Sequence, residues 1–381
     1  MMTLNVYPKL DLAIKSSQGM WLETESGQKI LDFYSGHGVI SIGHSHPVWV
    51  ARLESQLKHF AYYSNLVPLK EQEELCRALG ELSGCPDYNL FFSNSGAEAI
   101  ENALKTASIL NGRRQVVAMR GSFHGRTSLA AQITDASKLC SPINSGLDVM
   151  WVPLNNIEAA RVAISGQTAA VIIEGIQGVG GIWEGDTAFW QELSSLCQAS
   201  GALLIADEIQ SGMGRSGDFF AFQKHGAKVK PDIICTAKGL GNGFPIAATW
   251  IHERYVMPMG SLGSTFGGGP LACRAALAVC EVIAAEKLMT NAAVQGQYLI
   301  QGLSEIPGLK NIRGRGLMLA FDIEGNCEAL RLKLLHDYGL ITGNASTKNT
   351  VRLLPPLSVT REDCDYFFVQ LKSALKELHI S

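Results

Sequence analysis

Short apolar runs rich in β-branched residues alternate with helical stretches through the middle of the sequence. After a first run near Phe91, six further runs follow at residues 116–119, 149–153, 170–175, 202–207, 232–237 and 247–252. Helical patterns separate most of them, and this rhythm is typical of a mostly parallel sheet with helices on both faces. The sequence therefore predicts an α/β fold built on a seven-stranded sheet.

The segments on either side of this alternation predict smaller units. Residues up to about 36 contain a hairpin around 26–28, and helices are expected at 47–60 and 69–83. A long helical run covers 271–288, and strands at 313–323 and 350–357 and a helix at 360–378 follow it. We expect an N-terminal segment (1–36), a large domain (37–270) and a smaller α+β domain (271–381).

The composition excludes several classes of protein. Of the 381 residues, 46% are hydrophobic and 18% are charged, so the chain can bury a large core. A net charge of −3 gives no electrostatic footprint for nucleic acid or a membrane. The nine cysteines form no CxxC pair, and the first residues lack the apolar core of a leader. We therefore expect reduced thiols, no metal site and a cytoplasmic location.

Two of the apolar runs each end on one charged residue. Asp207 lies at the end of the apolar run in GALLIADEIQ, and Lys238 at the end of the run in PDIICTAKGLG. Each residue comes just before a turn or a glycine-rich segment. The carboxyl ends of parallel strands are where such sheets bind ligands, and a partly desolvated lysine there is a candidate Schiff-base former. A carboxylate beside it suits the ring nitrogen of pyridoxal 5′-phosphate (PLP). The pair is equally compatible with a structural ion pair.

A candidate phosphate site precedes a helix. YNLFFSNSGAEAIENALKTA places a strand, a polar turn and a helix in succession. Ser95 and its neighbours offer capping oxygens, and Gly96 and Ala97 let backbone N–H groups approach an anion. The motif lacks the Lys-Ser/Thr ending of a nucleotide P-loop, so it predicts a cradle for a phosphate monoester, or only a helix cap.

Three further motifs carry candidate residues. GSFHGRT offers the ring of Phe123 and the guanidinium of Arg126, and Glu174 ends another apolar run before glycines. GSTFGGGP offers the hydroxyls of Ser264 and Thr265. Taken singly, each has an ordinary structural explanation, as a core, surface, capping or turn residue. Their joint occurrence in this order favours a ligand site, and the absence of GxGxxG argues against a nicotinamide dehydrogenase.

These motifs together resemble a known family. NSGAEA, FHGRT, EGIQG, DEIQSGMGRSG, TAKGLGNGFP and GSTFGGGPLA, with LDFYSGHGVISIGHSHP earlier, look like class III PLP-dependent aminotransferases of fold type I. The likeness covers about residues 32–356 and is greatest to acetylornithine and ornithine aminotransferases. It implies PLP as cofactor and transfer of a distal (δ) amino group to 2-oxoglutarate.

The resemblance leaves the substrate open. N-acetylornithine, N-succinylornithine and ornithine all fit, giving a semialdehyde and glutamate in arginine biosynthesis. The alternative is an aminotransferase for another ω-amino acid, such as 4-aminobutyrate or succinyldiaminopimelate. An aminomutase and a catalytically silent binding protein are further hypotheses. Residues 34–42 and 62–67 are expected to line the end of the pocket that holds the acyl group.

Catalytic roles follow from the resemblance. Lys238 is expected to hold PLP covalently and then to move a proton, and Asp207 to pair with the pyridine nitrogen. His124 is expected to orient or pack rather than act as the base. Ile209 and Phe123 would contact the two faces of the ring.

The resemblance also implies contacts to the phenolic oxygen and the phosphate of PLP. Gln210 would lie near the phenolic oxygen of PLP, and Ser95, Gly96 and Ala97 would bind its phosphate. In relatives, a serine–threonine pair that matches Ser264 and Thr265 enters the active site from the other subunit. We expect Thr265 to bind the phosphate of PLP and Ser264 to contact the substrate. The resemblance thus implies a homodimer with shared active sites.

Two arginines are expected to divide the substrates. Arg126 would bind the α-carboxylate of the ω-amino substrate, and Arg352 that of 2-oxoglutarate or glutamate. Glu174 would pair with Arg352 while the first substrate is bound and swing away for the second. Four positions depart from residues common in relatives: Ile100 (Asn), Gly175 (Pro), Val179 (Glu) and Gly269 (Asn).

Overall fold

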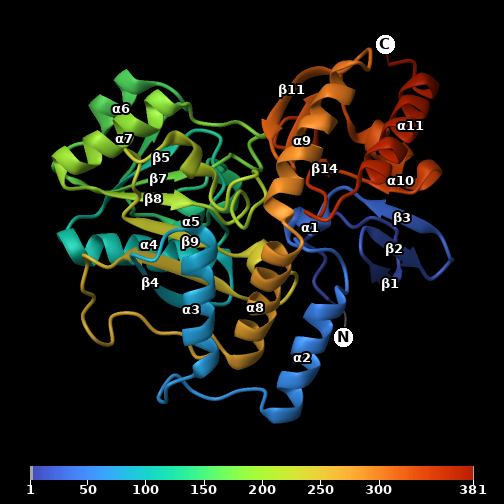
Figure 1. The fold of residues 1–381 in the computed structure, drawn as a ribbon. Helices are drawn as coiled ribbons and strands as arrows, with labels where there is room; N and C mark the ends of the chain where they lie inside the picture. Colours follow the sequence, from blue (N-terminus) through green and yellow to red (C-terminus); the bar gives the residue numbers. More distant parts are fainter. Residues whose placement is uncertain (1–2, 381) are drawn as a thin grey trace.

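A seven-stranded sheet organises the middle of the chain in the computed structural model, which describes residues 3–380 (Figure 1). Its strand order is β4-β10-β9-β8-β7-β5-β6. The run from β9 to β6 is parallel, and β10 is antiparallel to both β9 and β4. The bounds are β4 Tyr88–Ser93, β5 Gln115–Met119, β6 Val149–Val152, β7 Thr168–Glu174, β8 Leu203–Asp207, β9 Ile233–Thr236 and β10 Ala247–His252. The predicted mostly parallel sheet is confirmed.

Helices on both faces explain why the inner strands read as continuous apolar runs. All residues of β7, β8 and β9 are buried. Alternate residues of β7 enter different cores: Val171 and Ile173 pack with Trp190, whereas Ala170 and Ile172 pack with Ile100. The two faces are covered by α4 Gly96–Asn111 and α5 Ser128–Gln132, and by α6 Ile157–Ala163 and α7 Thr187–Ser200.

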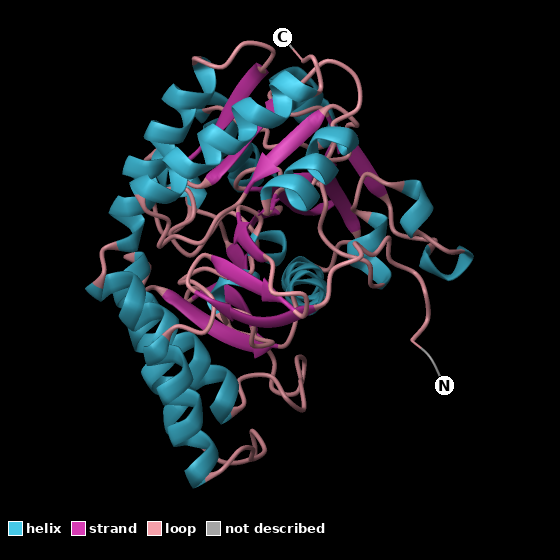
Figure 2. Cartoon of the chain, turned by 90° about the vertical axis from the view of Figure 1, so that its right-hand side faces the viewer, coloured by secondary structure: helices cyan, strands magenta, loops and turns pink. Residues whose placement is uncertain are grey.

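A group of helices lies beside this sheet, where α2 Pro47–His59 and α3 Lys70–Ser83 both pack against α8 Pro270–Ala285. The helix expected at 271–288 is confirmed as α8, although it ends at Ala285 rather than at Leu288. The chain breaks at Glu286 and Lys287, where Lys287 has a φ of 52°, and α9 Leu288–Ser304 then begins. In Figure 2 the strands fall into an upper and a lower group, with a column of helices along one side.

The two ends of the chain meet in a second region. Strands β1 Ile14–Gln18, β2 Trp21–Thr24 and β3 Lys29–Asp32 form an antiparallel meander, and β13 Leu340–Ile341 adds parallel to β3. A further sheet contains β11 Lys310–Arg315, β12 Met318–Asp322, β15 Thr350–Leu353 and β14 Gly343–Asn344. The remaining helices are α1 Ser35–Gly38, α10 Glu328–Tyr338 and α11 Arg361–Glu377. The division of the chain after residues 36 and 270 stays a prediction.

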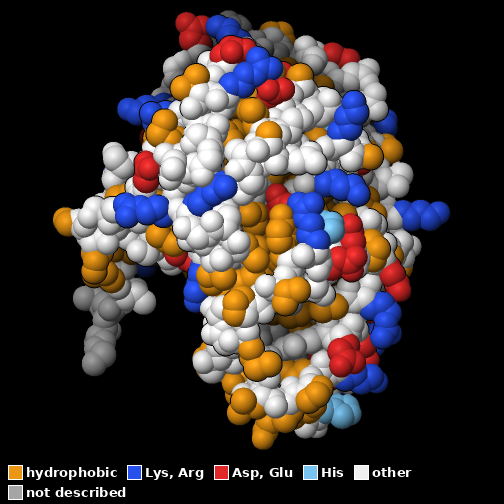
Figure 3. Space-filling view, turned by 90° about the vertical axis from the view of Figure 1, so that its left-hand side faces the viewer, with side chains coloured by type: hydrophobic (Ala, Val, Ile, Leu, Met, Phe, Trp, Pro, Cys, Tyr) orange, Lys and Arg blue, Asp and Glu red, His pale blue; other side chains and the backbone are white. Residues whose placement is uncertain are grey.

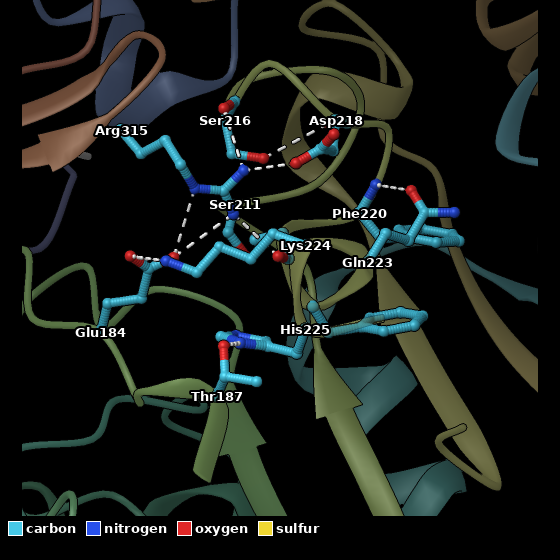
Figure 4. A network of polar contacts seen from close by, with 12 residues as sticks. Glu184, Thr187, Ser211, Ser216, Asp218, Phe220, Gln223, Lys224, His225 and Arg315 are labelled. Carbon is cyan, nitrogen blue, oxygen red and sulfur yellow. Dashed lines mark hydrogen bonds and ion pairs between the residues drawn. The ribbon is translucent and has the colours of Figure 1, made fainter. Parts of the chain in front are cut away.

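A polar network joins the C-terminal sheet to the segment between β8 and β9 (Figure 4). Arg315 of β11 donates to Asp218 at 2.5 Å, to Glu184 at 3.3 Å and to the carbonyl of Ala221 at 2.7 Å. Lys224 also pairs with Glu184 at 2.5 Å. The side chains of Arg315 and Glu184 are largely withdrawn from water, whereas that of Asp218 is exposed. The network connects the two regions through charge-assisted hydrogen bonds.

The surface carries exposed apolar side chains, and Figure 3 shows many of them on the lower part of one face. Large exposed hydrophobic residues recur in the segments 57–67 and 256–266. The two segments are in contact, since the rings of Tyr62 and Phe266 lie 5.5 Å apart. Within residues 3–380, no helix is long and apolar enough to cross a membrane.

Candidate active site

A cavity of about 300 Å³ opens where β7, β8 and β9 end and α4 begins. Glu174 is the last residue of β7, Asp207 is the last of β8, and Lys238 follows β9 by two positions. Since these strands are parallel neighbours, their ends meet at one edge of the sheet, as the sequence predicts. The cavity wall includes Asn94, Ser95, Gly96, Ala97, Phe123, His124, Glu174, Asp207, Ile209, Gln210 and Lys238.

Lys238 provides an amine that is easily deprotonated. Burial lowers its pKa to about 8, although the charges of Asp207 and Glu174 act in the opposite direction. Its backbone has a φ of 45° at the start of a short 3-10 turn, a conformation that disfavours most non-glycine residues. A strained, desolvated lysine in a cavity wall is typical of a reactive residue.

Asp207 is held by two contacts rather than by Lys238. One carboxylate oxygen lies 2.7 Å from Nδ1 of His124, and the other accepts the N–H of Ile209 at 3.0 Å. Both Asp207 and His124 are buried. Nε2 of His124 has no hydrogen-bond partner among the described residues. His124 thus fixes the orientation of the carboxylate, as expected of an orienting residue.

The start of α4 forms an anion cradle. Ser95 caps the helix by accepting the N–H of Glu98 at 3.3 Å, and the following residues Gly96 and Ala97 line the cavity. A Cβ on Gly96 would lie 3.0 Å from the side chain of Ile209, so only glycine fits without displacement. The helix N-terminus, with its unpaired N–H groups, favours a phosphate there.

Arg352 and Gln210 form a second polar group beside the cavity. Arg352 is buried and donates to the phenol of Tyr34 at 3.1 Å, to Oε1 of Gln210 at 3.4 Å and to the carbonyl of Asn344. Gln210 in turn donates to the carbonyl of His37 at 2.8 Å. The partners of this guanidinium are therefore all neutral.

Glu174 does not make the predicted pair with Arg352 in this structure. Its two carboxylate oxygens accept the N–H groups of Phe123 and Gly178, each at 2.9 Å. Burial raises its pKa to about 7. The two backbone contacts hold the side chain at the end of β7, which is why it does not reach the guanidinium.

Four predicted residues lie outside the cavity wall: Arg352, which lies beside it, and Arg126, Ser264 and Thr265. Arg126 is exposed, with its guanidinium 5.9 Å from the ring centroid of Tyr7. Thr265 is exposed as well. Ser264 accepts from Nδ2 of Asn94 at 3.3 Å, which places its hydroxyl beside the cradle. One copy of the chain thus brings together the residues expected around the cofactor, but neither Arg126 nor Thr265.

Sequence reasoning missed the side-chain contacts of Tyr34 and His37. It expected the segment that contains them to line the acyl end of a pocket, without naming their link to Arg352. The only signal was the placement of a tyrosine and a histidine in a glycine-rich turn, which local pattern alone does not connect to a residue 318 positions away.

Known proteins resemble this chain over almost its whole length. Residues 3–375 match the family described as "Aminotransferase class-III". The chain belongs to the class III aminotransferases. An acetylornithine aminotransferase of Halalkalibacterium halodurans is 40% identical, with 98% of each chain covered. One of Archaeoglobus fulgidus is 38% identical, with 95% of each covered.

Solved structures agree with this assignment. The ornithine aminotransferase of Toxoplasma gondii ME49 superposes with a TM-score of 0.90 at 26% identity, covering 99% of this chain and 93% of that one. Class III aminotransferases are PLP-dependent transaminases, and PLP is the cofactor of this enzyme. The residues present fit it: a helix N-terminus for phosphate, two apolar side chains for a ring, a buried carboxylate and a lysine of lowered pKa.

Proposed function

We propose that this enzyme transfers the δ-amino group of N-acetylornithine to 2-oxoglutarate, giving the semialdehyde and glutamate in arginine biosynthesis. The observation that carries the proposal is the partly buried Lys238, placed in one cavity with Asp207 and a helix N-terminus. The choice of substrate is supported by the acetylornithine aminotransferases that resemble the whole chain. N-succinylornithine and ornithine are the alternatives that the experiment below distinguishes.

We assign the central chemistry to Lys238 and Asp207. Bound PLP supplies an electron sink that stabilises negative charge at the substrate carbon that loses a proton. Lys238 holds the cofactor and moves that proton, for which an amine with a pKa of about 8 is suited near neutral pH. Asp207, oriented by His124, keeps its negative charge toward the ring nitrogen. Phe123 and Ile209 exclude water from the ring.

We assign the phosphate to the start of α4 and to a second copy of the chain. Ser95, Gly96 and Ala97 provide donors from one copy. Thr265 lies on an exposed loop, so we propose that the partner of a homodimer supplies this hydroxyl, with Ser264 next to the substrate. The exposed apolar segments 57–67 and 256–266 support this, since patches of that kind are commonly covered by another protein surface.

We assign substrate carboxylates to the two arginines. Arg126, whose guanidinium is accessible, is suited to the α-carboxylate of the ω-amino substrate. Arg352 is suited to the carboxylate of glutamate or 2-oxoglutarate. We assign Glu174 to pair with Arg352 while the ω-amino substrate is bound and to move away for the dicarboxylate. Its charge already acts on Arg352, and pairing requires it to leave its contacts with two N–H groups.

The test is a series of single half-reactions followed by cofactor absorbance. The PLP-loaded enzyme receives N-acetylornithine, N-succinylornithine, ornithine or 4-aminobutyrate, each without 2-oxoglutarate. Fastest conversion of the cofactor to its amine form by N-acetylornithine would support the proposal. Fastest conversion by another substrate would replace N-acetylornithine, and no conversion by any of them would refute transamination of these amines.

A further inference from the structure

The turn that follows β9 has an unusual backbone. Lys238 and Asn242 have φ values of 45° and 49°, a left-handed conformation that non-glycine residues keep only where surrounding contacts impose it. Lys238 begins a short 3-10 turn, in which its carbonyl accepts the N–H of Gly241 at 3.2 Å. Ordinary turns of this type have negative φ values, so contacts from outside the turn have to hold this backbone.

Those contacts come from a segment 198 to 201 positions away in the sequence. The hydroxyl of Ser41 donates to the carbonyl of Gly239 at 2.7 Å. Oδ1 of Asn242 accepts the N–H groups of Ser41 at 2.8 Å and Ile42 at 3.1 Å. Nδ2 of the same amide donates to the carbonyl of Gly43 at 3.0 Å. We call these four hydrogen bonds the clamp.

The clamp is shielded from water. Ser41 and Asn242 are only 2% and 3% exposed. A Cβ on Gly239 would lie 3.4 Å from the Cβ of Ser41, so the two segments are in close contact. The indole N–H of Trp49 adds a bond to the carbonyl of Gly241 at 3.1 Å. Because buried polar groups lose a great deal when their partners move away, the clamp can hold a strained backbone in place.

The clamp lies directly behind the cavity. Val39 lines the cavity from one of the joined segments, and Lys238 and Gly243 line it from the other. Ser41 and Asn242 themselves are not part of the wall. They can therefore act on the reaction only through the residues that they hold. Lys238 follows the end of β9 by two positions, so the turn, rather than the sheet, sets the direction of its side chain.

We propose that Ser41 and Asn242 are positioning residues for Lys238, because their buried hydrogen bonds hold its left-handed backbone and keep its amine directed into the cavity. The proposal rests on the function proposed above. When PLP is attached, the nitrogen of Lys238 bonds to the aldehyde carbon and the aldehyde oxygen leaves as water. A misdirected amine would perform this step and the later proton transfer more slowly, since both require a defined geometry.

The test uses two variants and one control. Ser41→Ala removes the hydroxyl. Asn242→Gly removes the amide, and glycine adopts a φ of 49° without strain, so the backbone of the turn is not the part that is damaged. Asn291→Ala is the matched control, because the amide of Asn291 joins the carbonyls of Leu357 and Val359 at 2.7 and 2.9 Å and lies outside the cavity wall.

Three quantities are measured for each protein. The rate at which cofactor-free protein attaches added PLP is followed by absorbance. The half-reaction kcat and KM of the PLP-loaded protein are measured with the amine that the wild type converts fastest, with hydrogen and then deuterium on the carbon that bears this amine. The affinity for non-covalent PLP is measured after each change is placed in a Lys238→Ala background.

We expect Ser41→Ala and Asn242→Gly each to lower the attachment rate and kcat about 3- to 10-fold, the scale of one net hydrogen bond. KM should change little, and the deuterium isotope effect on kcat should rise as proton transfer becomes more rate-limiting. In the Lys238→Ala background, neither change should alter the affinity for PLP. Asn291→Ala should lower the free energy of unfolding and leave the attachment rate and kcat unchanged.

An unchanged attachment rate and kcat in both variants would overturn the positioning role. A loss of PLP affinity in the Lys238→Ala background would also overturn it, because the clamp would then shape the pocket instead of acting through the lysine. Failure of the proposed function is distinguishable, since the wild type itself would convert none of the amines. Attachment of PLP requires no substrate and would still test the clamp in that case.

Discussion

Removal of the Lys238 amine should make the cofactor-free protein more stable, by an amount that depends on pH. Burial lowers the pKa of Lys238 from 10.5 to about 8, and this difference corresponds to about 3 kcal/mol against the charged form. The unfolded chain therefore binds more protons between about pH 8 and pH 10.5, and folding stability rises with pH across that window. Below pH 8 the full cost is present, and above pH 10.5 it is absent.

The assay is urea unfolding of cofactor-free wild type and Lys238→Met at pH 7 and at about pH 9.5. Any packing difference between lysine and methionine is the same at both values, so the change with pH isolates the charge. We expect the stability advantage of the variant to be about 2 kcal/mol smaller at the higher pH. Lys105→Met, an exposed lysine on α4, controls for the loss of one charge. An advantage of Lys238→Met that is equal at both pH values would refute the desolvated state of this amine.

Three further changes test other contacts. Lys238→Ala should abolish turnover while PLP still binds non-covalently; wild-type-like activity in a steady-state assay would contradict the assignment. Arg126→Ala should raise the KM for the ω-amino substrate much more than that for glutamate, and equal effects would refute the division between the two arginines. Arg315→Met leaves Asp218 and Glu184 short of a partner and should lower the free energy of unfolding by about 1–3 kcal/mol in urea; an unchanged value would show that the network does not stabilise the fold.

The central sheet could be predicted because its strands are buried on both faces. Such strands have to be apolar throughout, and their ends are marked by the first charged or glycine residue, which here gives Glu174, Asp207 and Lys238. The break between α8 and α9 could not be predicted in this way. It occurs at Glu286 and Lys287, without glycine or proline, and the apolar spacing continues across it.

The side-chain contacts within the site could not be predicted from local sequence patterns either. His124 and Asp207 are 83 positions apart, and only the fold brings them within 2.7 Å. The predicted pairing of Glu174 with Arg352 while the ω-amino substrate is bound stays a prediction. Without substrate, two backbone N–H groups bind the carboxylate of Glu174, and the sequence could not predict them because every residue other than proline carries such a group.

The contacts of Asp207 decide between the two explanations that the sequence left open for it and Lys238. A structural ion pair would place the two charges together, yet within residues 3–380 no ion pair includes Lys238, and both oxygens of Asp207 are bound elsewhere. The fold thus retains a desolvated amine that lowers its stability at neutral pH instead of contributing to it. Replacement by an apolar residue would relieve that cost. A lysine kept at such a position is explained by what a partly neutral amine can do at neutral pH, which is to attack a carbonyl carbon and to accept a proton.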